Sequence, residues 1–526
     1  MMMKKLDKFF LSDKYIITLL LLAGFAQDLV FVYCNVSHMH AVPLIFAVIV
    51  MIYRALRDPD FLSFRGAGIW GLFVVAFAIS FAANRFPAVR VNILELAILC
   101  MSGFLIYGAG SSRSRDSKLE DLSFISGVSF FTLSLNSVIS LITYIAGTSI
   151  QYFEPQGGYP SYIGVSYGFQ DRFTGLQGVP NALGWTCVCA IVWGFVWLST
   201  RRERRPAVTV ISIILMIISG ICIGLTFSRG SLLALTSGLI FYCIYRILTN
   251  RKKKTTAKAA LEIILSVVLI AGAAYASTNV SAYVNAKTNA AWYARQAESS
   301  ASDSTADSAT DAEKPSADVQ EANSGNRLVS QFQSGDVSNG RGTINEIGFK
   351  LLVYNKQLAY GVSPGNARGA WKEFVSEHEN LISDKKYEFT RKDDKISGNM
   401  HNVFTQTVYN YGLVGLIALL LLVFLFIKTA VMRLKDPDDG RESGIGAALF
   451  MAVCAIGTIA MFENILIDSM KIYNVSFMYL LGVYIGACTN EEPEGALEKA
   501  DRWLGGWLRA VGRVLCVKPY DNTDMK

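Results

Sequence analysis

Residues 400–428 read MHNVFTQTVYNYGLVGLIALLLLVFLFIK, and this stretch shows what kind of protein the chain is. From Val403 onward it holds an apolar run long enough to cross the hydrocarbon core of a bilayer as a helix, which takes about 20 residues. The polar segment 279–400 precedes it, so His401 stands where polar sequence meets a hydrophobic helix. We therefore expect the His401 imidazole at a membrane–water boundary.

The whole chain has the composition of a membrane protein. Of its 526 residues, 52% are hydrophobic and 17% are charged, whereas a soluble domain has about 25% charged residues. The mean hydropathy is +0.35. We predict an all-α polytopic membrane protein with about twelve transmembrane helices. The expected spans lie near residues 15–33, 41–55, 68–84, 91–108, 123–147, 179–199, 207–227, 230–248, 260–278, 403–429, 443–463 and 470–488.

Lysine and arginine are distributed unevenly over the segments that connect these spans. If the N-terminus is inside, the inner segments and the long loop hold nearly all of the 49 basic residues. The short outer loops then hold only Arg85, Arg90, Arg172, Arg229 and Lys471. Because basic residues are enriched in cytoplasmic loops, we expect both termini in the cytoplasm. The net charge of +7 reflects this topology and gives no support for a nucleic-acid partner.

This topology divides the chain into four parts. Residues 1–278 are expected to form an N-terminal membrane bundle of about nine spans, and residues 279–400 an extracytoplasmic loop subdomain. Residues 401–490 are expected to form the C-terminal membrane spans. Residues 491–526 are a cytoplasmic tail in which tryptophan and leucine alternate with arginine at near-helical spacing, a pattern typical of an amphipathic helix on the inner leaflet.

The long outer loop contains two kinds of sequence. Residues 297–325 are rich in serine, alanine and aspartate and have almost no large apolar side chain. Such a segment cannot bury a core, so we predict that this insert is disordered and dispensable for activity. Further on, Thr343 to Glu346 has the pattern of a capping box, which predicts a helix over about 343–357. The apolar face of this helix would be Ile344, Ile347, Leu351 and Leu352. A second short helix is predicted around Trp371, Phe374 and Val375.

Four basic side chains stand where helices are expected to begin at the outer face. Arg172 and Arg229 each precede or open an inward-running span, and His401 precedes another. Arg341 lies directly before the predicted loop helix. The N-terminus of a helix presents backbone N–H groups and the positive end of its dipole, and a guanidinium pairs bidentately with phosphate oxygens. The sequence therefore predicts a phosphate or diphosphate site.

Each of these residues also has an ordinary interpretation. Arg172 or Arg229 alone is typical of an interfacial anchor whose side chain reaches the lipid headgroups. Arg341 alone is compatible with a solvated loop residue, and His401 alone with a helix cap. The interpretation as a site depends on the independent argument that places all four residues on one side of the membrane.

A transporter or flippase that catalyses no reaction is the alternative class of function. Such a protein would carry ionisable residues within its spans and repeats related by symmetry. The evident acidic residues within spans are Asp28 and Glu95, and no internal repeat is evident in the sequence. A large external subdomain also argues against a simple transporter.

In its motifs the chain resembles the O-antigen ligase and O-antigen polymerase superfamily of bacterial membrane glycosyltransferases. The motifs lie within residues 170–232 and 338–416, and the insert 297–325 touches none of them. In chain order they are Arg172-Phe173-Thr174-Gly175 with Pro180-Asn181, Thr226-Phe227-Ser228-Arg229-Gly230, Gly340-Arg341 before a helix and the loop Tyr360-Gly361-Val362-Ser363-Pro364-Gly365, and His401-Asn402 followed by Tyr411-Gly412-Leu413-Val414-Gly415.

The resemblance implies a membrane glycosyltransferase bundle with one large external loop between late spans. It implies transfer or polymerisation of a glycan from an undecaprenyl diphosphate-linked donor to an acceptor hydroxyl at the outer face of the bacterial cytoplasmic membrane. By the same resemblance Arg229 and Arg341, together with Arg172, would hold the diphosphate and His401 would be catalytic. Ligase, polymerase and protein O-oligosaccharyltransferase activities stay open, so the acceptor is a glycan, a lipid or a protein.

The chemistry of these residue types agrees with the resemblance. Breaking the bond between an anomeric carbon and a diphosphate requires stabilisation of charge on the leaving group, which arginines supply. The acceptor hydroxyl must lose its proton, and imidazole is suited to that task near neutral pH. No acidic metal cluster is evident on the outer loops, so we expect the reaction to need neither a metal nor another cofactor. Asp171 and Glu346 are the two carboxylates that would be available as ligands if a metal were bound.

Overall fold

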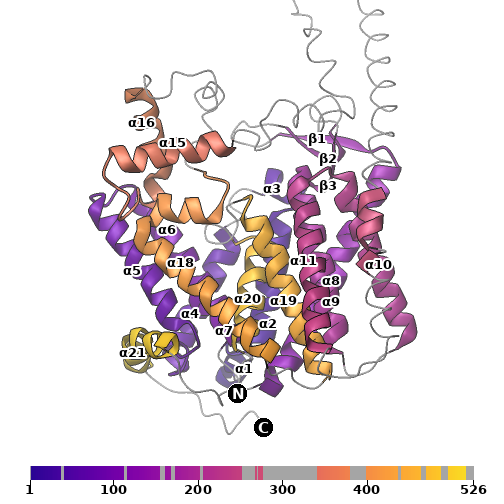
Figure 1. Ribbon diagram of the computed structural model, residues 1–526, viewed down its shortest axis with the longest axis horizontal. Helices are drawn as coiled ribbons and strands as arrows, with labels where there is room; N and C mark the ends of the chain where they lie inside the picture. The colour runs from indigo at the N-terminus through magenta and orange to yellow at the C-terminus, as the bar shows by residue number, and fades with distance from the viewer. Residues whose placement is uncertain are drawn as a thin grey trace, which may run out of the picture.

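The structure is a computed structural model of a mostly helical protein (Figure 1). It describes residues 2–36, 41–111, 115–153, 160–166, 172–201, 205–250, 267–268, 270–276, 341–378, 399–435, 440–463, 470–486 and 496–516. The insert 297–325 lies outside the described residues, as does much of the predicted span 260–278.

The described helices follow the order of the predicted spans. The first part of the chain forms α1 (Met2–Phe10), α2 (Asp13–Gln27), α3 (Val30–Asn35), α4 (Ala41–Arg57), α5 (Ala67–Ala83), α6 (Val89–Cys100), a π-helical turn (Met101–Tyr107), α7 (Gly108–Ser111), α8 (Arg115–Ile145), α9 (Pro180–Thr200), α10 (Pro206–Leu225) and α11 (Arg229–Asn250). The second part forms α15 (Arg341–Tyr354), a 3₁₀ turn (Pro364–Asn366), α16 (Ala367–Glu377), α18 (Val403–Lys435), α19 (Gly440–Ala460), α20 (Ile472–Gly486) and α21 (Ala496–Leu515).

Six helical segments among the described residues are long and apolar enough to cross a membrane. They are Val89–Ser111, Leu119–Ile145, Pro180–Thr200, Pro206–Leu225, Arg229–Thr249 and Val403–Lys435. Three shorter apolar helices cover Ala67–Ala83, Gly444–Ala460 and Ile472–Gly486. The protein is therefore a helical membrane protein, and the total of about twelve spans stays a prediction.

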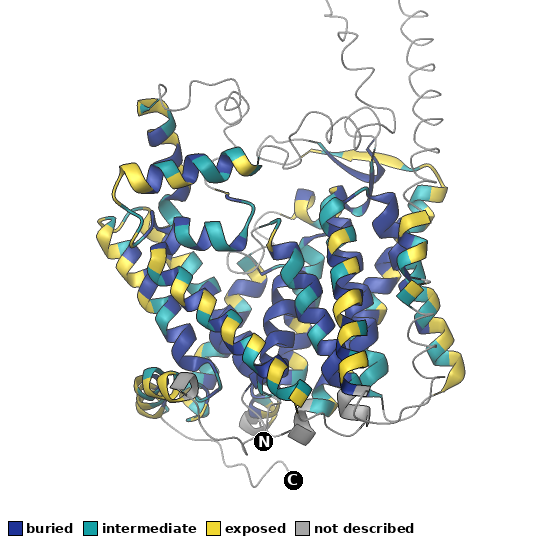
Figure 2. Ribbon diagram, viewed as in Figure 1, coloured by how far each residue is buried: buried dark blue, intermediate teal, exposed yellow. Residues whose placement is uncertain are grey.

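Helix α9 forms the centre of the bundle. It packs against α8, α10 and α19, and Figure 2 shows buried residues concentrated on the central helices and exposed residues on the outer faces of α10 and α18. A helix that is apolar on all sides is buried either in protein or in the bilayer, and 78% of the apolar window of α9 is buried inside the protein. One of its few polar side-chain atoms, Trp193 Nε1, donates to Ser476 Oγ of α20 at 3.0 Å.

The prediction of an all-α fold is wrong for the loop 148–178. This loop forms an antiparallel sheet of three strands in the order β1 (Ser149–Tyr152), β2 (Ser161–Val165) and β3 (Phe173–Gly178). The sheet lies over the same end of the bundle as the N-terminus of α9 (Figure 1). Its residues are mostly buried, and a buried backbone needs hydrogen-bond partners that neighbouring strands provide. Thr174 Oγ1 adds a donated bond to Tyr162 O at 2.6 Å.

Helices α15 and α16 form a compact unit at the same end of the bundle, which we call the external unit (residues 341–378). The predicted apolar face of α15 is confirmed, because its four residues are buried in one core with Trp371 and Phe374 of α16. The predicted capping box is wrong. Helix α15 begins at Arg341, so Thr343 lies inside its first turn and does not cap it. The same core includes Met400 and Tyr409, which join the external unit to α18.

The external unit is also joined to α18 by a backbone crossing. Helix α18 is broken at Gly412, whose φ is 66°. Around this break Val362 N donates to Tyr409 O at 2.8 Å, and Leu413 N donates to Leu358 O at 3.0 Å. A Cβ on Gly412 would lie 2.3 Å from Ala359 O, so only glycine allows the two backbones to approach this closely.

Two carboxylate–guanidinium pairs lie at the opposite end of the bundle, where α1 and α21 are found (Figure 1). Asp7 Oδ2 is 2.9 Å from Arg57 Nη2, and Asp13 Oδ1 is 2.6 Å from Arg54 Nη1. These pairs join α1 and α2 to the end of α4. We call them the inner pairs.

Helix α21 is attached at that end through a carboxylate. Asp501 accepts hydrogen bonds from Gly66 N at 2.8 Å and from Gly68 N at 2.9 Å. These donors are backbone N–H groups at the N-terminus of α5, where a negative charge is favourable. The predicted tail therefore contains a helix that packs along α5, while Trp503 remains 79% exposed.

Candidate functional site

The central feature of the candidate site is the carboxylate of Glu463, just beyond the end of α19. Its Oε2 lies 2.7 Å from Nδ1 of His401, and its Oε1 accepts a hydrogen bond from Nη2 of Arg341. A carboxylate that accepts from Nδ1 places the proton of a neutral imidazole there and leaves the Nε2 lone pair to act as a base. The structure thus brings two of the predicted site residues onto one carboxylate that sequence reasoning did not identify.

The backbone around His401 is held in an unusual conformation. His401 has φ 48°, in the left-handed region that residues other than glycine seldom adopt. Asn399 Oδ1 accepts from His401 N at 3.0 Å. Asn402 caps α18 by accepting from Phe404 N at 2.9 Å, and its own Nδ2 donates to Met461 O at 2.9 Å. The start of α18 is therefore bonded to the end of α19, which holds His401 near Glu463.

Arg341 is positioned by the first turn of α15. Asn345, one turn further along α15, accepts a hydrogen bond from Thr405 Oγ1 of α18 at 3.0 Å. This bond fixes the start of α15 over the start of α18. The Arg341 side chain is 28% exposed, that of His401 is 25% exposed and that of Glu463 is 13% exposed. The two basic groups can therefore reach a ligand, while the carboxylate lies behind them.

Arg229 and Arg172 lie at the corner between α10 and α11. Arg229 is the first residue of α11, and Arg172 Nε donates to Thr226 O at 3.0 Å. Phe227 at this corner has a left-handed backbone with φ 50°. A Cβ on Gly230 would lie 4.0 Å from Cβ of Phe462, so the N-terminus of α11 packs beside the residue that precedes Glu463.

An apolar cavity lies directly below this cluster, and we define it by fifteen lining residues. Its volume is about 140 Å³. Val403 and Phe404, next to His401, line one end together with Met461, which is close to Glu463 in sequence. The remaining lining residues are Trp70, Phe73, Leu419, Leu422, Val423, Phe426, Val453, Gly457, Ala460, Phe477, Met478 and Leu481. The cluster therefore combines cationic groups with an adjoining apolar space between membrane helices.

The other residues noted in the sequence lie elsewhere. Glu346 is paired with Lys350 on the surface of α15 at 3.2 Å. Asp171 lies outside the described residues. Within the described part of the chain, no group of three or more His, Cys, Asp or Glu side chains could hold a metal ion.

Glu463 could have been found from one signal in the sequence. It is an acidic residue at the end of an apolar span, and ionisable groups near the membrane usually have a partner. Its partners, however, are 62 and 122 residues away in the chain. No local pattern links them, so only the fold brings them together.

Comparison with known proteins agrees with this geometry. Residues 214–420 match a family model described as O-antigen ligase. The resemblance to the O-antigen ligase and polymerase superfamily is confirmed. The matched segment includes Arg229, Arg341 and His401, and it ends before Glu463. No curated protein matches the chain in sequence.

The O-antigen ligase match supports a general activity. It supports transfer of a glycan in the biosynthesis of cell-surface polysaccharide, by a helical protein of a bacterial membrane. In general, a protein of this class uses a lipid-linked glycan as the donor and a second molecule as the acceptor.

Proposed function

We propose that the protein transfers a glycan from an undecaprenyl diphosphate-linked donor to an acceptor hydroxyl at the outer face of the cytoplasmic membrane. The observation that carries the proposal is the carboxylate of Glu463, which accepts from both His401 and Arg341 beside an apolar cavity. This arrangement offers a base, cations for a diphosphate and a space for a lipid.

In this proposal His401 is the general base. Its Nδ1–H donates to Glu463, so Nε2 is the atom that accepts the proton of the acceptor hydroxyl. A base that is oriented by a third group is the usual arrangement for activating a hydroxyl nucleophile. Glu463 also stabilises the imidazolium that forms, and it acts as a positioning residue because it contacts neither substrate.

The bond changes follow from these roles. The acceptor oxygen forms a bond to the anomeric carbon of the donor sugar, and its proton passes to Nε2 of His401. The bond from the anomeric carbon to the diphosphate oxygen breaks, and its electron pair leaves with the diphosphate. The products are a glycosylated acceptor and the lipid diphosphate.

The arginines are proposed to hold the leaving diphosphate. Arg229 and Arg341, with Arg172 further along the same surface, supply positive charge where negative charge develops in the transition state. Nη2 of Arg341 donates to Glu463, and a guanidinium has five N–H donors in all. Arg341 can therefore contact a phosphate oxygen and Glu463 at once.

The apolar cavity is proposed to take the first part of the polyprenyl chain. Its lining is formed by apolar side chains of α5, α18, α19 and α20, and it begins at the residues next to His401. A ligand with a charged head and a hydrocarbon tail would place its head at the arginines and its tail in this cavity. The volume of about 140 Å³ is enough for only part of a long chain, and the rest would lie in the bilayer.

Reconstituted transfer tests the proposal directly. The purified protein is incubated in lipid with a polyprenyl diphosphate-linked oligosaccharide and, in separate reactions, with a glycan, a lipid-linked core saccharide or a protein acceptor. We expect one molecule of polyprenyl diphosphate to be released for each acceptor molecule that is glycosylated. The acceptor that is used distinguishes polymerase, ligase and protein O-oligosaccharyltransferase. Transport of the intact donor across the membrane without product would contradict glycan transfer and support the flippase alternative.

A further inference from the structure

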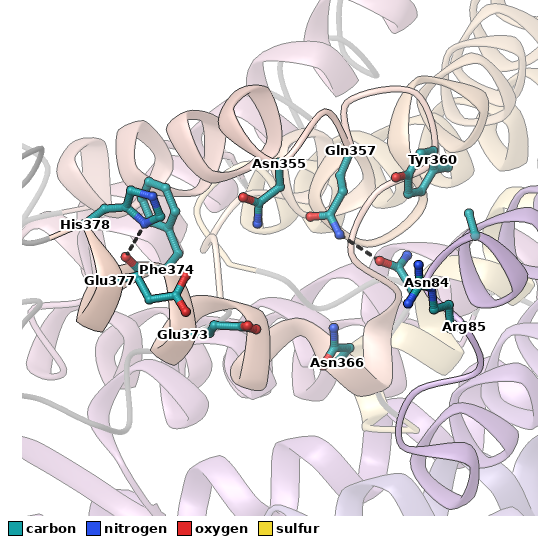
Figure 3. Close-up of a pocket in the computed structure, with 11 residues that line it drawn as sticks. Asn84, Arg85, Asn355, Gln357, Tyr360, Asn366, Glu373, Phe374, Glu377 and His378 are labelled. Carbon is teal, nitrogen blue, oxygen red and sulfur yellow. Dashed lines mark hydrogen bonds between the residues drawn. The ribbon is translucent and has the colours of Figure 1, made fainter.

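A second cavity, lined largely by polar side chains, lies between the external unit and the C-terminal end of α5, at the far end of α15 from Arg341. Its volume is about 520 Å³, and we call it the polar cavity. It is lined by Ala83, Asn84, Arg85, Asn355, Gln357, Tyr360, Asn366, Glu373, Phe374, Glu377 and His378. Figure 3 shows Asn355 and Gln357 on one side of this space and Glu373 and Asn366 on the other.

We propose that the polar cavity binds a neutral or amino-bearing oligosaccharide, and that this glycan is part of a substrate of the transfer reaction. The inference rests on the proposed function, because it assigns a binding site for the sugar portion of a substrate. The glycan can come from the donor or from the acceptor, and the two sources share the same hydroxyl-rich chemistry.

The chemistry of the lining favours sugars. Each sugar hydroxyl donates one hydrogen bond and accepts others, so it is matched by side chains that offer both donors and acceptors. Asparagine and glutamine amides do so, and carboxylates add strong acceptors. The polar cavity has four amides and two carboxylates within one space. Tyr360, which is half-buried at its edge, offers an aromatic ring that can contact an apolar sugar face.

The charge of the lining excludes the diphosphate as the ligand. Glu373 and Glu377 face the cavity, against the single guanidinium of Arg85. Two carboxylates repel a doubly charged phosphate group and accept hydrogen bonds from hydroxyl or ammonium groups. The polar cavity therefore suits the sugars of a substrate, whereas the cluster at Glu463 suits the diphosphate of the carrier.

The walls of the polar cavity are fixed relative to one another. Gln357 Nε2 donates to Asn84 Oδ1 at 2.8 Å, and Asn84 Nδ2 donates to Gly361 O at 2.9 Å (Figure 3 shows the first). The ring of Tyr354, at the end of α15, packs edge-on against the ring of His378 at the end of α16, with centroids 4.2 Å apart, and this contact joins the two walls. A binding site with walls held in place loses less entropy when a ligand is ordered in it.

Backbone strain is concentrated around the same cavity. The described residues include seven non-glycine residues with a left-handed backbone. Two of them, Phe227 and His401, belong to the candidate site. The other five lie in or beside the segments that line the polar cavity, and they are Arg85, Phe86, Ala88, Lys356 and Ser363. Because such strain persists mainly where function requires it, its distribution sets these two places apart from the rest of the molecule.

Helix α15 connects the polar cavity to the cluster at Glu463. Helix α15 runs from Arg341, at Glu463, to Tyr354, beside Asn355. Its 14 residues give a length of about 21 Å at roughly 1.5 Å per residue. A glycan a few sugars long could therefore occupy the polar cavity while its reacting end lies at His401.

Direct binding tests the proposal without requiring turnover. The probe is the free oligosaccharide released by mild acid from a polyprenyl diphosphate-linked donor, and its affinity for the purified full-length protein is measured by calorimetry. The test variant combines Asn355→Ala and Glu373→Ala, both at exposed positions, and a second variant carries Tyr360→Ala. We expect each to weaken binding about tenfold, as the loss of one or two hydrogen bonds or a ring contact does. The control is Ser376→Ala, an exposed position on α16 outside the cavity.

Steady-state kinetics identify the source of the glycan. If the donor's sugars occupy the polar cavity, the KM for the lipid-linked donor rises in the test variants. If the acceptor's sugars occupy it, the KM for the acceptor rises instead. Unchanged oligosaccharide affinity and unchanged KM values in both variants would overturn the proposal and leave glycan transfer standing. Oligosaccharide binding that the variants lose, in a protein that transfers no glycan to any acceptor, would instead overturn the proposed function and leave the cavity assignment standing.

Discussion

The inner pairs and the cluster at Glu463 use the same kinds of side chain in different ways. In the inner pairs each carboxylate has its own guanidinium, and the side chains of Asp7, Asp13, Arg54 and Arg57 are 4% to 13% exposed. In the Glu463 cluster one carboxylate is shared by a guanidinium and an imidazole that are 28% and 25% exposed. The inner pairs are closed and balanced, whereas the cluster presents basic groups to the surface.

The number of basic groups on each carboxylate sharpens this difference. The inner pairs have two carboxylates for two guanidinium groups. In the Glu463 cluster one carboxylate accepts from both Arg341 and His401. A closed pair near one end of the bundle stabilises the fold, while partly exposed basic side chains near the other end suit an anionic ligand. Ion pairing alone therefore does not distinguish the two groups, whereas the exposure of the basic side chains and the sharing of one carboxylate do.

The largest expected effect concerns the sides of the membrane on which the two groups lie. A reporter fused at position 310 should be active only outside the cytoplasm, and one fused at position 440 only inside. This all-or-none result follows from the uneven distribution of lysine and arginine. Activity of both fusions on the same side would contradict the topology and, with it, the assignment of the Glu463 cluster to the outer face.

Replacement of His401 should have the largest effect on turnover. We expect His401→Ala to lower transfer by ~10²–10⁴-fold, the usual contribution of a general base. Binding of the lipid-linked donor should be retained, because His401 is proposed to act on the acceptor. Turnover and donor binding are measured separately with purified protein. Near-normal turnover would show that histidine is not the base, and deprotonation by the leaving phosphate would become the preferred mechanism.

Glu463→Gln should separate positioning from binding. We expect a ~10²-fold fall in turnover, because the amide no longer orients the imidazole or stabilises its charged form. Donor binding should be unchanged or tighter, since the cluster loses a negative charge. Glu346→Gln, which alters a surface pair on α15, is the matched control and should behave as wild type. A Glu463→Gln protein with weaker donor binding and normal kcat would contradict the proposed role.

Replacement of the arginines should act on binding first. Arg229→Lys and Arg341→Lys keep the charge and lose the bidentate geometry. We expect the affinity for the lipid-linked donor to fall about tenfold in each, and donor to accumulate in cells that express the variant. Arg90→Lys, at an exposed position in the first turn of α6, serves as the control. Equal donor affinity in all three variants would show that no guanidinium binds the diphosphate in a fork.

The smallest effect is expected at the inner pairs. Burial alone would raise the pKa of Asp7, but hydrogen bonds from Arg57 and Tyr53 outweigh it and lower the pKa below its ordinary value. The stabilisation is therefore present above the unfolded pKa of about 3.9 and is lost as the pH falls through the folded value.

Asp7→Asn should lower the melting temperature by roughly a few degrees at pH 7. The difference should shrink below about pH 4, and turnover at 25 °C should be normal. Lost turnover with an unchanged melting temperature would mean that the inner pairs serve the reaction.

The sequence predicted much of the helical framework and the general position of the basic residues. Apolar runs of about 20 residues specify membrane helices strongly because the bilayer requires them. The spacing of Ile344, Ile347 and Leu351 predicted the buried face of α15 for a similar reason. These predictions succeeded because each depends only on the number and spacing of apolar residues within one segment.

Features that depend on contacts between distant segments could not be predicted in this way. The sheet at residues 149–178 forms because three short segments pair with one another, and none of them has a strong alternating pattern. Helix α15 begins two residues before the expected cap, since its start is fixed by the contacts of Arg341 and Asn345 with Glu463 and Thr405. The role of Glu463 itself arises only when α15, α18 and α19 meet.

The break at Gly412 has a consequence for how the protein is made. The helical residues 413–435 alone measure about 34 Å at roughly 1.5 Å per residue, enough to cross the hydrocarbon core of about 30 Å. The translocation machinery could therefore insert this segment by itself and release residues 403–411, with their polar Gln406 and Asn410, to the far side. Residues 358–362 are synthesised before α18, so the backbone that bonds to Tyr409 and Leu413 is already available when the span arrives. Biogenesis of the site would then end with this docking step, after insertion is complete.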